Sequence, residues 1–192
     1  MTFHYFTDNQ ISPLYISAIL IVCSIIFFQK GKTNISLFFL FIGSLGLGYF
    51  IANLDPFLIL WDEQYHALVA KNLVKNPLKP TLYSNPILGY DYRNWTENFI
   101  WLHKQPLFLW QMALSVKLFG LNTLAVRLPS IILHALTVLL IYRIGKISHS
   151  ERIGYYGGLF FAFSYYILEL VSGKFSTDHN DIAFLFYVAS SF

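Results

Sequence analysis

The chain has few charged residues and a single cysteine. Charged side chains make up 12% of its 192 residues, whereas a soluble domain carries about 25%. Cys23 lies within an apolar run, so no intramolecular disulfide can form and the cysteine count does not reveal the redox compartment. The sequence contains no dinucleotide-binding glycine pattern, P-loop or paired-cysteine zinc motif. The net charge of +3 is concentrated in short loops, which indicates membrane orientation and not nucleic-acid binding.

Long apolar segments dominate what is present. Hydrophobic residues make up 56% of the chain and aromatic residues 19%, which predicts an all-α integral membrane protein. The expected spanning segments are residues 11–28, 35–54, 129–147 and 153–172. A fifth apolar run begins at Ile182 and reaches only Phe192, about half of the roughly 20 residues that a spanning helix needs. We therefore interpret the chain as the N-terminal part of a larger polytopic protein.

The predicted domain organisation has three parts. Residues 1–61 hold two transmembrane helices, residues 62–128 form an outer loop, and residues 129–192 hold the further transmembrane helices. In the loop, apolar spacing predicts a helix at its start. A structureless connection of this length is uncommon in a compact protein and is more often functional. Residues 106–119 are apolar but too short to span the membrane, which favours an interfacial helix.

Two acidic clusters follow apolar segments, and their sidedness follows from the basic loops. The positive-inside rule places Lys30 and Lys32 in the cytoplasm, so the next helix delivers Asp62 outside. If residues 106–119 do not cross, the loop at residues 143–152 is cytoplasmic and Asp178 is also outside. If they did cross, this basic loop would be outside and the bilayer would separate the acids. The non-crossing arrangement satisfies both basic loops and is the one we predict.

Each polar motif has a functional and a structural interpretation. Asp62 and His66 lie four residues apart on one face of the predicted helix, and a carboxylate beside an imidazole suits proton abstraction from a hydroxyl. Alternatively, Asp62 and Glu63 only complement the dipole at a helix N-terminus. The segment DHND at residues 178–181 offers three potential ligands for a divalent cation, or it caps the next helix. Taken alone, both patterns favour the structural interpretation.

Two lysines and a histidine add to these motifs. His103 and Lys104 precede the predicted interfacial helix and offer a metal ligand and a phosphate-binding cation. Lys104 is otherwise an interfacial lysine whose ammonium reaches water. Lys174 either pairs with a phosphate or marks the membrane interface.

Several of these motifs occur in the order seen in one family. WDEQYHALVA at residues 61–70 resembles the acidic signature in the first outer loop of polyprenyl-phosphate-dependent GT-C glycosyltransferases, which include the protein O-mannosyltransferase and lipid A aminoarabinose transferase groups. HKQPLFLW at residues 103–110 resembles the stretch that leads into a juxtamembrane helix. KLFG at residues 117–120 and VRLPS at residues 126–130 resemble the link into the next spanning helix. FSTD at residues 175–178 is similar to the second acidic motif.

The chain departs from the family pattern at several positions. Tyr65 stands where an arginine is frequent, His103 replaces an acidic residue, and Gln105 replaces a proline. The leading helix at residues 11–28 is an addition to the commonest arrangement, which has one helix before the acidic loop.

The resemblance implies a GT-C-like helical fold with interfacial helices in the outer loop. It also implies a membrane glycosyltransferase that moves a sugar from a polyprenyl-phosphate donor to a hydroxyl of a lipid or protein acceptor on the outer face. The catalytic residues that it implies are Asp62, Glu63 and Asp178. The residues expected to contact the donor phosphate are Lys104, Tyr65 and Lys174. The ligands expected for a divalent metal ion are His103, Asp178 and Asp181.

The expected partners are the lipid-linked donor, its acceptor and membrane lipids, with no nucleic acid. The expected location is the bacterial plasma membrane. Three alternatives stay open: a transporter or flippase, a noncatalytic membrane scaffold, and an inactive fragment. A transporter should carry ionisable residues near the bilayer midplane, whereas these acids lie at segment boundaries.

Overall fold

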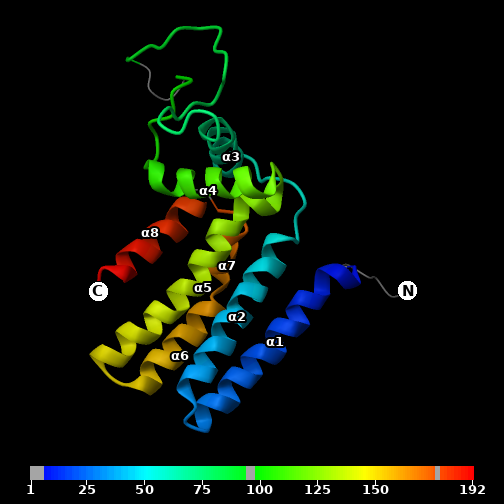
Figure 1. Ribbon diagram of the computed structural model, residues 1–192, viewed down its shortest axis with the longest axis vertical. Helices are drawn as coiled ribbons and strands as arrows, with labels where there is room; N and C mark the ends of the chain where they lie inside the picture. The colour runs from blue at the N-terminus through cyan, green and yellow to red at the C-terminus, as the bar shows by residue number, and fades with distance from the viewer. Residues whose placement is uncertain (1–6, 94–97, 176–177) are drawn as a thin grey trace.

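The described part of the chain is built of α-helices, and the predicted all-α class is confirmed (Figure 1). The computed structural model describes residues 7–93, 98–175 and 178–192. Ser176 and Thr177 of the second acidic motif lie outside these ranges. The helices are α1 (Asp8–Gln29), α2 (Thr33–Ala52), α3 (Asp62–Leu73), α4 (Pro106–Phe119), α5 (Thr123–Ser148), α6 (Glu151–Ala162), α7 (Tyr165–Val171) and α8 (Asp178–Ser190).

Among the described residues, three helices are long and apolar enough to cross a membrane. They are α2, α5 and the Gln10–Gln29 part of α1, and they match the first three predicted spanning segments. Helix α5 begins at Thr123 and not at Pro129, because the side chain of Asn122 accepts a hydrogen bond from the Ala125 amide at 2.8 Å and caps the helix earlier.

The fourth predicted spanning segment, residues 153–172, is not one continuous helix. The structure divides it into α6 and α7, which meet at Phe163 and Ser164. Ser164 has the extended backbone of an N-cap, with φ −60° and ψ 116°. Serine is favoured at N-caps, although the Ser164 side chain makes no capping hydrogen bond here. Hydropathy does not register this preference, so the prediction of an unbroken helix was wrong.

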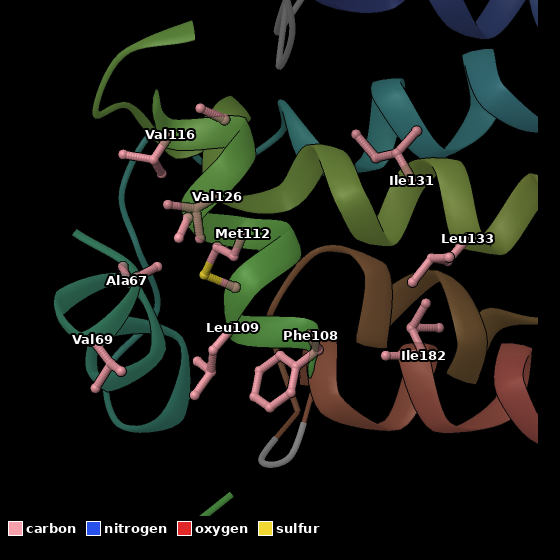
Figure 2. Packing of buried hydrophobic residues seen from close by; sticks show 14 of the residues in the cluster. Ala67, Val69, Phe108, Leu109, Met112, Val116, Val126, Ile131, Leu133 and Ile182 are labelled. Carbon is pink, nitrogen blue, oxygen red and sulfur yellow. The ribbon is translucent and has the colours of Figure 1, made fainter. Parts of the chain in front are cut away.

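Helix α4 has the predicted bounds and lies across one end of the long helices (Figure 1). Its length and its proline start agree with the expected interfacial helix. Its buried face packs on α3, α5 and α8, as Figure 2 shows. Phe108, Leu109 and Met112 are each at most 4% exposed. This core joins α3 and α4 to the long helices and therefore sets the position of the polar residues around it.

An isolated β-bridge joins two parts of the connection between α3 and α4. Thr81 and Ile100 form an antiparallel bridge, flanked by hydrogen bonds from the Leu82 amide to the Phe99 carbonyl (2.8 Å) and from the Trp101 amide to the Pro80 carbonyl (2.9 Å). These bonds hold the segment that follows Pro77 beside the segment that leads into α4.

Candidate active site

Asp62 and Lys104 lie side by side at the starts of two helices. Asp62 is the first residue of α3, and Lys104 lies just before α4. The Lys104 Nζ is 3.8 Å from the Asp62 Oδ2, and the two side chains are 11% and 21% exposed, respectively. A carboxylate and an ammonium group that both remain partly open can act on a bound ligand. The structure thus brings together the predicted base and the predicted phosphate-binding cation.

The backbone is strained directly before Asp62. Trp61 has φ 76° and ψ −120°, and it is the only non-glycine residue with positive φ in the described part of the chain. Such a conformation costs of order 1–3 kcal/mol in a non-glycine residue and is concentrated at functional sites. The unusual turn sets the direction in which α3 begins, and with it the placement of the two acids that open the helix.

His66 connects the two acidic motifs directly. Its Nδ1 lies 3.1 Å from Oδ1 of Asp178, and both side chains are fully buried. The Asp178 carboxylate also accepts a hydrogen bond from the backbone amide of His179. Helix α3 and helix α8 therefore meet on the same side of the bundle. This contact brings the two acidic clusters together, and the face of the membrane on which they lie stays a prediction.

Glu63 lies at the centre of a buried ionic cluster. Arg127 in α5 donates to both of its carboxylate oxygens, from Nε at 2.6 Å and from Nη2 at 2.9 Å. The Ile59 amide donates to Oε2 at 2.6 Å, and the His179 Nε2 lies 3.3 Å from Oε1. Burial alone would raise the pKa of Glu63, but Arg127 and His179 outweigh it and lower the pKa from 4.5 to about 2. Glu63 is therefore a fixed anion near neutral pH.

Arg127 also closes the end of α2. Its guanidinium donates to the backbone carbonyls of Ala52 (2.7 Å), Asp55 (2.8 Å) and Phe57 (2.9 Å). These carbonyls lie at the end of α2 and in the turn that leads to α3, so one buried side chain ties α2, α3 and α5 together. Arginine suits this task because it has five donors in a fixed planar arrangement.

The other two residues predicted to contact the phosphate, Tyr65 and Lys174, interact with residues other than Asp62 and Lys104. Tyr65 stacks on Trp101, with ring centroids 5.5 Å apart. The Lys174 Nζ lies 3.7 Å from Oε1 of Glu169 and its side chain is 43% exposed.

The predicted metal ligands do not form a ligand group. His103 packs edge-on against Trp101, with ring centroids 5.4 Å apart. Asp178 is engaged by His66. Within residues 7–93, 98–175 and 178–192, no three or more His, Cys, Asp or Glu side chains are grouped so that they could hold a metal ion. The expected divalent cation stays a prediction.

Sequence reasoning singled out Asp62, Glu63 and Asp178 but missed the partners of Glu63 and Asp178. Arg127 was noted only as part of a linking motif, and His66 was matched with Asp62 and not with Asp178. One signal for Arg127 was available. An arginine at the start of a largely apolar spanning segment is costly to bury unless it is paired, which indicates a buried anionic partner.

Comparison with known proteins agrees with the motif order. Residues 103–192 match the family model described as dolichyl-phosphate-mannose-protein mannosyltransferase. The matched range holds Lys104, Arg127 and Asp178, whereas Asp62 and Glu63 precede it. No curated protein and no solved structure matches the chain. The match agrees with the suspected family: over residues 103–192 the chain is similar to membrane glycosyltransferases of the dolichyl-phosphate-mannose-protein mannosyltransferase kind.

Proposed function

We propose that this chain forms the donor and base site of a glycosyltransferase that moves a sugar from a polyprenyl-phosphate donor to an acceptor hydroxyl. The observation that carries the proposal is the pairing of Asp62 with Lys104 at 3.8 Å. A sugar transfer from a phosphate needs a base for the incoming hydroxyl and a cation for the departing phosphate, and these two groups are adjacent here.

In the proposed reaction, the Asp62 carboxylate takes the proton of the acceptor hydroxyl. The freed oxygen attacks the anomeric carbon, and the bond from this carbon to the phosphate oxygen breaks. The polyprenyl phosphate leaves with the bonding electron pair, and its negative charge increases as the bond breaks. Lys104 faces this growing charge, and an oriented cation that acts mainly in the transition state accelerates the step.

Glu63 has a different proposed role. Its low pKa and its two-point contact with Arg127 make it a poor proton acceptor at neutral pH. We assign it to positioning, because it holds the first turn of α3 against α5. Asp178 in α8 holds the same helix through His66. Tyr65 and Lys174 remain candidates for contacts to the donor, Lys174 as a second cation.

The proposed location follows from the basic loops. Lys30, Lys32 and the loop after α5 would face the cytoplasm, and the Asp62 site would face the outside of a bacterial plasma membrane. A donor held in the membrane would reach this site at the level of α4, the interfacial helix. The acceptor would be a lipid or a protein that presents a hydroxyl at the outer surface.

The test is a transfer assay with polyprenyl-phosphate mannose as the donor in membranes that contain the full chain. Asp62→Asn keeps the size of the side chain and removes its basicity, so transfer should fall by about 100-fold or more. Asp55→Asn is the matched control, since Asp55 is a partly exposed acid outside the proposed site and its side chain accepts from the Phe57 amide. Transfer by the Asp62→Asn chain at the wild-type rate would refute the assignment of the base.

A further inference from the structure

A pocket of about 350 Å³ lies beside Lys104, and the proposed chemistry leaves it unused. Three segments build it: the turn around Pro77 and Pro80, residues 101–104, and the first turns of α4 up to Trp110. Its size lies within the range of small-molecule sites, roughly 300–1,000 Å³. Lys104 is one of its walls, so the pocket opens next to the Asp62–Lys104 pair.

The walls of this pocket are held in place. The Trp110 indole N–H donates to the Pro77 carbonyl at 2.7 Å, which fixes the ring although its residue is 40% exposed. Trp101 is held through its backbone amide by Pro80 and through its ring by Tyr65. A tryptophan that only anchors a protein at a membrane interface directs its N–H toward water or headgroups. Here the Trp110 N–H is satisfied by the protein, so the ring serves as a preformed wall.

From these observations we infer that the pocket binds a pyranose ring, with the indole rings of Trp101 and Trp110 against its C–H faces and Lys104 at its hydroxyl edge. Asp62 does not line the pocket, but its carboxylate lies 3.8 Å from the Lys104 Nζ and so near that edge. A pyranose has faces of weakly positive C–H groups and a rim of hydroxyls. The π face of an indole is negative and attracts such hydrogens. The carboxylate accepts from hydroxyls and the ammonium donates to them. An apolar pocket with a few polar groups at one edge is the usual form of such a site.

This inference rests on the proposed function and makes it more specific, because it places a sugar beside the proposed base. The sugar is either that of the donor or one that belongs to the acceptor. Both share the chemistry of the ring, and the binding experiment separates them.

The experiment measures binding of methyl α-mannopyranoside and other methyl pyranosides to the full chain by saturation-transfer difference NMR. The chain is kept in lipid nanodiscs without glycoside detergents, whose sugar headgroups would compete. We expect saturable, millimolar binding. Trp110→Ala should weaken it by roughly tenfold, whereas Trp110→Phe, which keeps an aromatic face, should weaken it less. Tyr92→Ala, at an aromatic residue that is 74% exposed and lies outside this pocket, should leave it unchanged.

Competition identifies the source of the sugar. If polyprenyl-phosphate mannose displaces the pyranoside and sugar-free polyprenyl phosphate does not, the pocket holds the donor sugar. If both ligands bind together, the pocket holds a sugar of the acceptor. Absence of saturable binding by any pyranoside, or equal binding by the wild type and Trp110→Ala, would overturn the inference. So would occupation of the pocket by bilayer lipid or inorganic phosphate alone.

The transfer assay and the binding experiment test separate claims, so the failure of one can be told from the failure of the other. A chain that binds pyranosides through Trp110 but transfers no sugar would refute the proposed function and leave the binding site standing. A chain that transfers sugar with the same KM for donor and acceptor in Trp110→Ala as in the wild type would refute the binding site alone.

Discussion

Replacing Glu63 with glutamine should destabilise the protein strongly, because the change leaves the Arg127 guanidinium buried without its anion. Both side chains are 0% exposed and joined at two points, 2.6 Å and 2.9 Å. Removing one partner of a buried ion pair costs about 3–5 kcal/mol. The pKa gives an independent figure: lowering it from 4.5 to about 2 corresponds to roughly 3 kcal/mol of stability at neutral pH.

The pH dependence has a definite direction. Glu63 has a lower pKa in the folded chain than in the unfolded chain, so its contribution is fully present above about pH 4.5. That contribution decreases as the pH falls toward 2, where the folded carboxylate takes up its proton. Glu63→Gln should remove this part of the acid sensitivity, while any other carboxylates that titrate in the same range keep theirs.

The assay is thermal unfolding in nanodiscs, followed by near-ultraviolet circular dichroism. For a chain of this size, 3–5 kcal/mol corresponds to a lower midpoint by roughly 6–20 °C. Glu151→Gln is the matched control, because Glu151 pairs with Lys146 at 3.2 Å while both side chains are about half exposed (44% and 53%), and it should leave the midpoint unchanged. A Glu63→Gln midpoint within about 2 °C of the wild type would refute the view that this ion pair holds α3 on α5.

Two further substitutions test the packing around the acids. Gly173→Ala should lower the unfolding midpoint more than Gly31→Ala, because both glycines have positive φ but only at Gly173 would a Cβ overlap the Glu63 carboxylate; equal losses would contradict that close approach. His66→Phe should cost about 1–3 kcal/mol by leaving the buried Asp178 carboxylate without its imidazole, and Asp178→Asn added to it should recover part of the loss. Additive losses in the double variant would show that the two side chains do not interact.

Much of the fold could be predicted because length and hydropathy determine it. Apolar runs located α1, α2 and α5, and the short run that starts at Pro106 predicted the bounds of α4. Parity of the basic loops predicted that both acidic clusters face the same side of the membrane, and the His66–Asp178 contact is compatible with that arrangement. The break before α7 escaped prediction, because one serine in an apolar run leaves the mean hydropathy nearly unchanged.

The sequence identified several residues of the site, but it did not show which of their side chains pair with each other. Glu63 and Arg127 are far apart in the sequence, and nothing in local spacing links a carboxylate in α3 to a guanidinium in α5. The pairing of Asp62 with Lys104 depends on how the connection between α3 and α4 folds back at the Thr81–Ile100 bridge. Local patterns identify side chains that are costly to bury, and only the tertiary fold determines which of them meet.

Sidedness is the most direct test of the account, because one active site requires both acidic motifs on one face of the membrane. Single cysteines at the exposed positions Lys75, Phe175 and Ser148, each on a Cys23→Ala background, would be treated with an impermeant maleimide in intact cells. The account predicts labelling of Lys75→Cys and Phe175→Cys and protection of Ser148→Cys. Labelling of Lys75→Cys together with protection of Phe175→Cys would place the motifs on opposite faces and contradict the shared site.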